Sequence, residues 1–162
     1  MRDYQKYATI VALFAAVLYL ALVVAALGLI SLATNQEVIP ETDAGPLVGP
    51  SMAGAAVILV FVMLLILGVG TPAARERVAV GWAFLTGLGA YLIFILVGAT
   101  LYAIGTGELV QLLIFAAAQL PSPFAWATGI LALIVTLAYS WILAARVGEH
   151  GRPLWPWERR GE

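Results

Sequence analysis

The sequence has no cysteine, one histidine and one lysine among its 162 residues. Without cysteine the chain cannot form disulfides, iron–sulfur clusters, thiolate zinc sites or a cysteine nucleophile. The one histidine, His150, cannot supply both axial ligands of a haem held between helices, and we expect it to be a solvated or interfacial side chain. Lys6 precedes the first apolar run, so no lysine is available for a buried Schiff base. The sequence therefore predicts no cofactor, no metal site and no catalytic residue.

Charge is scarce as well, because 10% of the residues are charged and 63% are apolar. Soluble domains carry about 25% charged residues. A soluble fold of this length could not bury so much apolar surface, so we expect lipid to take the place of water around the chain. The formal net charge of −1 indicates neither nucleic acid nor a strongly charged partner. The lipid bilayer is therefore the first partner that the composition predicts.

Four apolar runs are each long enough to cross a hydrocarbon core, which takes about 20 helical residues. They cover residues 8–33, 52–70, 78–104 and 124–145. The first run is longer than the apolar region of about 7–15 residues in a signal peptide, so we expect it to be a retained helix. The sequence predicts an all-α fold, a bundle of four transmembrane helices forming a single membrane domain over residues 1–162, with a polar tail at 146–162.

One further apolar segment, residues 108–120, is too short to span the membrane and lies between a glycine-rich turn and a Pro-Ser-Pro sequence. On a helix, Glu108, Gln111, Phe115 and Gln119 would share one face, and the remainder would be mostly apolar. We expect a short interfacial helix with amphipathic character or a re-entrant helix. A third possibility is a helix that docks on a neighbouring subunit.

Basic residues predict the orientation of the four spans. Loops on the cytoplasmic side of a membrane are enriched in Lys and Arg. All eight basic residues fall on one side of the predicted spans: Arg2, Lys6, Arg75, Arg77, Arg146, Arg152, Arg159 and Arg160. The opposite side carries Glu37, Glu41, Asp43 and Glu108 and no basic residue. We therefore expect both termini to be cytoplasmic.

The five tryptophans agree with this topology, because tryptophan is enriched at membrane interfaces. We expect Trp82 and Trp141 to be anchors at the inner interface and Trp126 at the outer one. Trp155 and Trp157 lie in the polar tail among arginines, a composition that suits an anchor on an anionic inner leaflet.

Small residues recur at every fourth position of the fourth span, and we call this stripe the helix-packing seam. It consists of Thr128, Ala132, Thr136, Ser140 and Ala144. Transmembrane helices associate where small residues let their backbones approach. Similar stripes occur in the first span at Ala8, Ala12 and Ala16 and in the third at Ala79, Ala83 and Gly87. We therefore expect close contact among spans one, three and four, with the second span peripheral or facing a partner.

Two tyrosines, Tyr19 and Tyr91, lie near the middle of their spans. A phenol without a hydrogen-bond acceptor is costly in such surroundings. Thr136 lies at a similar depth, so the sequence predicts a Tyr–Thr network across three helices.

In its four spans, acidic first loop, arginine-bearing middle hairpin and Trp/Arg tail, the chain resembles small uncharacterised four-helix membrane proteins of actinobacteria. Together with the predicted orientation, the resemblance implies a bacterial cytoplasmic (plasma) membrane location. It implies no activity and assigns no functional residue.

Two classes of function fit these observations. The first is a non-catalytic accessory or assembly subunit of a larger membrane complex, which binds other membrane proteins or itself. The second is a homo-oligomeric channel or small transporter with a pore between protomers. The side chains available for such a pore are Thr86, Thr100, Gln111, Gln119, Thr128, Thr136 and Ser140. An enzyme is not expected, because catalysis needs positioned titratable groups and the four spans contain none.

Cysteine labelling tests the orientation, and the cysteine-free sequence makes each introduced thiol unique. We expect an impermeant maleimide added to intact cells to label Asp43→Cys and to leave Glu149→Cys unlabelled until the membrane is opened. The reverse pattern would contradict cytoplasmic termini.

Overall fold

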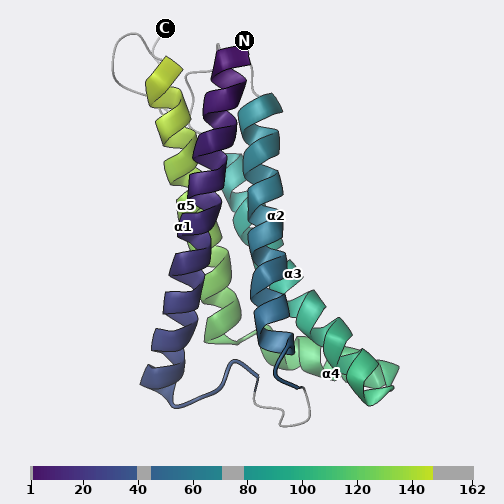
Figure 1. Cartoon of the computed structure of the whole chain (residues 1–162). Helices are drawn as coiled ribbons and strands as arrows, with labels where there is room; N and C mark the ends of the chain where they lie inside the picture. Colours follow the sequence, from purple (N-terminus) through teal and green to yellow (C-terminus); the bar gives the residue numbers. More distant parts are fainter. Residues whose placement is uncertain (1, 40–44, 71–78, 148–162) are drawn as a thin grey trace, which may run out of the picture.

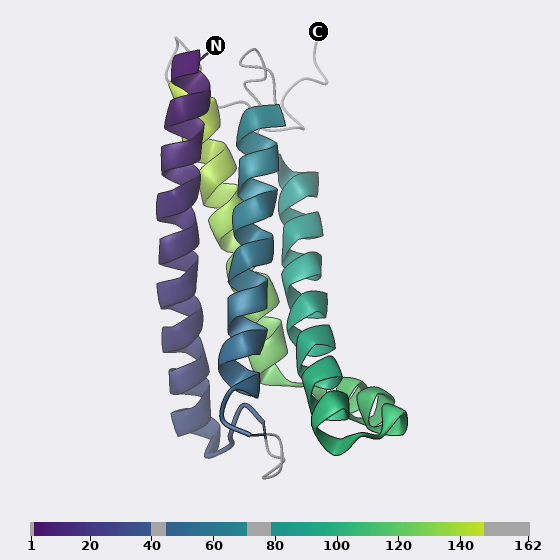
Figure 2. The same cartoon turned by 45° about the vertical axis from the view of Figure 1, so that its right-hand side comes forward.

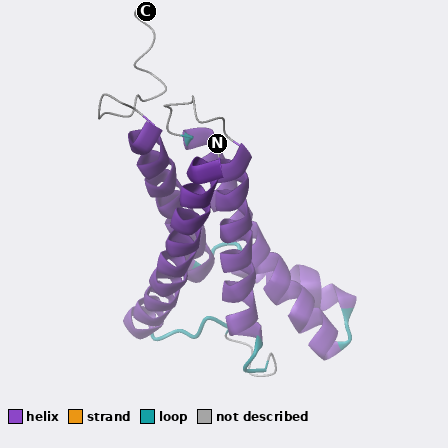
Figure 3. Ribbon diagram, turned by 45° about the horizontal axis from the view of Figure 1, so that its top comes forward, coloured by secondary structure: helices purple, strands orange, loops and turns teal. Residues whose placement is uncertain are grey.

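The computed structural model describes residues 2–39, 45–70 and 79–147, and the described chain consists of helices joined by loops (Figure 3). The helices are α1 (Arg2–Thr34), α2 (Val48–Gly70), α3 (Val80–Thr106), α4 (Leu109–Gln119) and α5 (Pro123–Val147). Four of them are long and apolar enough to cross a membrane, over Gln5–Thr34, Val48–Gly70, Val80–Thr106 and Pro123–Ala145. The predicted all-α fold, with four long apolar helices and one short helix before the last, is confirmed.

Backbone geometry explains where two of the long helices end. Asn35 follows α1 with a φ of 53°, and Gly107 follows α3 with a φ of 73°. Both residues are in the left-handed region, which terminates a helix and which asparagine and glycine tolerate best. The N–H of Gly107 also donates to the carbonyl of Ala103, so it satisfies one of the free carbonyls at the end of α3.

The four long helices run side by side, and α4 lies across one end of the bundle (Figures 1 and 2). We call this end, where α1 and α3 finish and α2 and α5 begin, the acidic end, because Glu37 and Glu108 lie there. α3 leans outward towards its C-terminus, and α4 folds back from that point to the bundle (Figure 1). As a result, the acidic end is wider than the end that carries the N-terminus (Figure 2).

The second span is not peripheral. α2 packs against α1, α3 and α5, whereas the main neighbours of α1 are α2 and α5 rather than α3. The expectation of a peripheral α2 was wrong, because a large side chain can pack closely where a glycine on the facing helix leaves space for it. Met52 of α2 is fully buried and occupies the space beside Gly98 of α3, where an added Cβ would lie 2.7 Å from the Met52 sulfur.

α3 and α5 approach each other closely at a pair of glycines. A Cβ on Gly129 would lie 2.9 Å from the Cβ of Tyr91 and 3.0 Å from the carbonyl oxygen of Gly87. A Cβ on Gly87 would lie 3.0 Å from the carbonyl oxygen of Gly129. The two backbones are therefore in contact, in the way that small residues permit in membrane helices.

This contact predicts that Gly129→Ala destabilises the protein by about 1–3 kcal/mol, the usual cost of overpacking. The matched control is Gly28→Ala in α1, because no atom lies within 4 Å of its added Cβ. The control should be neutral or slightly stabilising, since alanine favours a helix over glycine. Thermal unfolding of the two variants in one detergent provides the comparison. An unchanged midpoint for Gly129→Ala would contradict the glycine contact.

Candidate functional site

The helix-packing seam of α5 lies inside the protomer. All five of its residues are buried, at 0–4% exposure, in the helix that packs against α1, α2 and α3. The small side chains of the seam therefore face other helices of the same chain. Their role in assembly stays a prediction, but they are not on a surface that a second copy could contact.

Three threonine and serine hydroxyls in the bundle interior donate to the backbone of their own helices. Thr128 donates to the carbonyl of Phe124 at 2.9 Å, and Thr86 to that of Trp82 at 2.9 Å. Ser140 donates to the carbonyl of Leu137 at 2.9 Å. Such bonds satisfy the hydroxyl without a partner on another helix. These three hydroxyls therefore do not form a relay from helix to helix.

Three tyrosines join distant parts of the chain through backbone carbonyls. The Tyr19 hydroxyl of α1 donates to the carbonyl of Thr128 in α5 at 3.1 Å. The Tyr139 hydroxyl of α5 donates to the carbonyl of Ala8 in α1 at 3.1 Å. Tyr91 donates to the carbonyl of Leu120, just after α4, at 2.7 Å. α1 and α5 are thus tied together twice, and Tyr91 ties α3 to the chain that leads into α5.

The predicted Tyr–Thr network was therefore correct in requiring acceptors and wrong in naming Thr136. Thr136 Oγ1 is buried and has no hydrogen-bond partner among the described residues. A carbonyl already in a helix has a second lone pair, which a phenol can use. Tyr139 was missed in the sequence. Its hydroxyl fits where Gly68 of α2 has no side chain, since an added Cβ there would collide with the hydroxyl oxygen.

The described tryptophans differ in their surroundings. Trp126 and Trp141 are exposed near opposite ends of α5, whereas Trp82 is half-buried and donates to the carbonyl of Met63 at 3.2 Å. The first two positions suit interfacial anchors, a role that stays a prediction, and Trp82 also joins α3 to α2. Trp155 and Trp157 lie outside the described residues, as does His150.

The face that α4 turns to the bundle is the one that contains its polar residues. Phe115 and Gln119 are 2% and 4% exposed, and Gln111 bonds the carboxylate of Glu108 at 3.3 Å. The exposed residues of α4 are all apolar: Leu109, Val110, Leu113, Ile114, Ala117 and Ala118. An amphipathic helix at an interface would turn a polar face to water. α4 instead offers an apolar surface on the outside.

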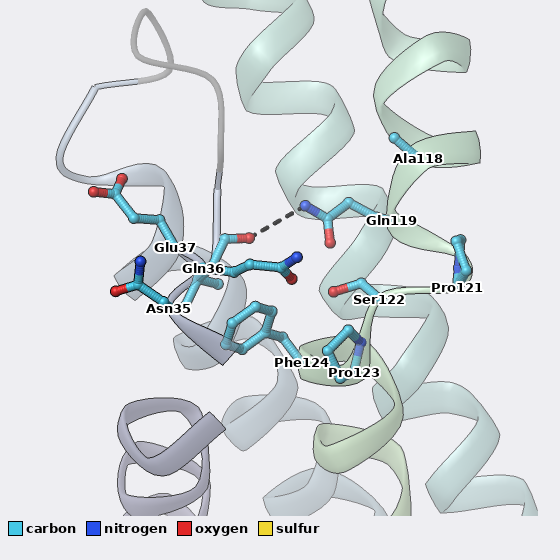
Figure 4. A pocket seen from close by; sticks show the side chains of 10 residues that line it. Asn35, Gln36, Glu37, Ala118, Gln119, Pro121, Ser122, Pro123 and Phe124 are labelled. Carbon is cyan, nitrogen blue, oxygen red and sulfur yellow. Dashed lines mark hydrogen bonds between the residues drawn. The ribbon is translucent and has the colours of Figure 1, made fainter. Parts of the chain in front are cut away.

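A groove of about 610 Å³ lies at the acidic end, between the chain that follows α1 and the turn that joins α4 to α5 (Figure 4). Gln119 bridges its two walls, because its amide nitrogen donates to the carbonyl of Val38 at 3.3 Å. The Ser31 hydroxyl holds the first wall by donating to the carbonyl of Gln36 at 2.7 Å. The N–H of Ser122 holds the second by donating to the carbonyl of Gln119 at 3.1 Å.

Within the described part of the chain, no three histidines or carboxylates come together as a metal site would require. The groove and the buried tyrosine contacts are therefore the most structured polar features that the fold presents.

These observations define a class of protein before they define a family. Four long apolar helices whose outward faces are apolar, with polar side chains turned inward, make this a multi-pass membrane protein. The chain belongs to the DUF6121 family, a family of unknown function, which it matches over residues 1–162. No curated protein and no solved structure is similar enough to match it.

Loss of one tyrosine contact should be measurable. We expect Tyr19→Phe to destabilise the protein by about 0.6–1.7 kcal/mol, the range of interhelical hydrogen bonds in membranes. Tyr102→Phe is the control, because the Tyr102 ring keeps its stacking on Phe115, with centroids 5.2 Å apart. Unfolding in detergent with increasing dodecyl sulfate gives both values. Equal stability of the two variants would show that the Tyr19 hydroxyl does not tie α1 to α5.

Proposed function

We propose that this protein is a non-catalytic accessory or assembly subunit of a larger membrane complex. The observation that carries the proposal is the division of its surface, with polar side chains inside the bundle and large apolar ones outside. Phe14 of α1 is 70% exposed, Ile58 of α2 66% and Phe84 of α3 62%. Such a protein offers other membrane proteins a surface for packing, and the described parts of its spans expose few polar side chains to a soluble substrate.

The α3–α4 arm is the part of the molecule best placed for a partner. Its apolar surface includes Ile104, 72% exposed, Leu109, 84% exposed, and Leu113, 70% exposed. The arm extends sideways from the bundle at the acidic end (Figure 2). A transmembrane helix of another subunit could lie in the angle between the arm and the long helices and cover side chains from both.

A pore between protomers is the alternative, and the positions of its candidate lining residues disfavour it. Five of the seven are buried within one protomer: Thr86, Gln119, Thr128, Thr136 and Ser140. Thr100 is exposed, but its hydroxyl donates to the carbonyl of Leu96 at 2.7 Å. A pore between protomers would therefore be lined mainly by apolar side chains, which exclude water and ions.

We further propose that the acidic end is extracytoplasmic and that both termini lie in the cytoplasm of a bacterial cell. The support is the distribution of basic residues along the sequence, because none of them falls in the connections at the acidic end, residues 35–47 and 107–122. The subunit would then present the α3–α4 arm in the outer half of the membrane.

Affinity purification in mild detergent tests the function directly. We expect the purified material to contain other membrane proteins, identified by mass spectrometry, in stoichiometric amounts that its native mass reports. Leu109→Gln with Leu113→Gln should weaken their recovery, because both side chains are exposed on the arm. Phe14→Gln, an equally exposed change on α1, is the control and should retain them.

A homo-oligomer without other proteins would contradict the subunit proposal. It would favour the channel, and the next measurement would be flux into liposomes with the wild type and with Thr136→Leu.

A further inference from the structure

We propose that the groove at the acidic end binds a primary ammonium group, through the side-chain oxygen of Gln119 and the carboxylate of Glu37. Both residues line the groove, one from each wall. Figure 4 shows the Glu37 carboxylate turned away from Gln119, so this exposed side chain rotates towards the groove when the two residues share a ligand. This site goes beyond the subunit proposal and does not depend on it.

The orientation of the Gln119 amide is fixed by its neighbour. The carbonyl of Val38 can only accept a hydrogen bond, so the nitrogen of Gln119 must face it, as the 3.3 Å contact shows. The side-chain oxygen is consequently turned the other way. In Figure 4 it points into the space between Gln36 and Ser122, away from the dashed bond to Val38.

This oxygen lacks a donor. Gln119 is 4% exposed, and its Oε1 has no hydrogen-bond partner among the described residues. A buried carbonyl without a donor costs about 1–3 kcal/mol, which a ligand with an N–H group would recover on binding. The missing partner must be a donor, because an oxygen of this kind only accepts.

Both walls of the groove are held in place before a ligand arrives. Phe124, which lines the groove at the start of α5, is 2% exposed and belongs to the same apolar cluster as Phe115 of α4. The opposite wall begins at Asn35, whose left-handed backbone turns the chain out of α1. Walls that are held in this way lose little conformational freedom when a ligand binds.

Charge selects a cation as the donor. Glu37 is exposed at the groove, and no lysine or arginine occurs in the connections at this end, residues 35–47 and 107–122. The N-terminus of α5 is also near, and a helix N-terminus favours anions. Here its first residue is Pro123, which has no N–H, and no basic side chain supports an anion. The acidic surroundings therefore favour a positively charged donor.

A primary ammonium group meets both requirements. It carries three N–H donors, so it can serve Gln119 and Glu37 together. A quaternary ammonium has the same charge and no N–H, so it leaves the Gln119 oxygen without a partner. The group could belong to the ethanolamine headgroup of a phospholipid or to a soluble alkylamine, and the volume of about 610 Å³ accommodates either.

The lipid arm of the test compares phosphatidylethanolamine with phosphatidylcholine of identical acyl chains, bound to the full-length protein and measured by native mass spectrometry. The soluble arm compares ethylamine with tetramethylammonium, followed through the NMR signal of the Gln119 side-chain amide. We expect a preference of roughly tenfold for the primary ammonium in at least one arm, equivalent to one charge-assisted hydrogen bond. Preference in the lipid arm identifies a headgroup as the source, and preference in the soluble arm alone identifies a free amine.

Two variants assign the preference to the groove. Glu37→Gln removes the charge from an exposed side chain, and Gln119→Leu removes the unpaired oxygen. Each should reduce the preference by roughly threefold or more, since each loses one of the polar contacts. Glu108→Gln is the control, because this carboxylate lies at the same end outside the groove lining and should leave the preference unchanged.

Equal binding of primary and quaternary ammonium in both arms would overturn the proposal. So would an unchanged preference in Glu37→Gln, which does not alter a buried contact and therefore remains informative if Gln119→Leu fails to fold.

Discussion

Contact between the backbones of α3 and α5 at Gly87 and Gly129 sets the positions of much that surrounds it. At this separation Tyr91 lies over Gly129, and its hydroxyl reaches the carbonyl of Leu120. That bond holds the chain between α4 and α5, so it also fixes the neighbouring Gln119 and one wall of the groove. A wider spacing of the two helices would move Tyr91 away from Leu120. The arrangement of the acidic end thus depends on two glycines inside the bundle, Gly87 and Gly129.

The acyl chains of a bilayer form no hydrogen bonds, and the interior of the bundle is organised around that restriction. Apart from Thr136, the buried threonine and serine hydroxyls use carbonyls of their own helices, and the buried phenols of Tyr19 and Tyr139 use carbonyls of a facing helix. The same restriction bears on function, because side chains that are satisfied inside one protomer are not offered to an ion, a substrate or a second copy. What remains outside is an apolar surface that only lipid or another membrane protein can cover.

Length and composition were enough to predict the four spans and the short helix before the last, because crossing a membrane requires long apolar runs. The small residues of α5 were also recognisable, since a spacing of four puts them on one face. The central place of α2 was not recognisable in the sequence, because it depends on Met52 filling the space beside Gly98 of another helix. The acceptors of the tyrosine hydroxyls could not be predicted either, because every residue has a backbone carbonyl and the sequence does not show which one accepts. For α4 the polar face was identified correctly, but polarity alone could not decide whether it met water or protein.

The outward lean of α3 and the return of α4 give the molecule unequal ends. Because α4 has no polar residue on its exposed side, the outer surface of α4 suits acyl chains or a neighbouring subunit better than water. A molecule of this shape that spans a membrane would occupy more lateral area in one leaflet than in the other. The free energy of such a wedge depends on the lateral pressure in the wider leaflet, so it falls where the bilayer bends to relieve that pressure. Such a bundle would thereby be coupled to bilayer curvature through its shape alone.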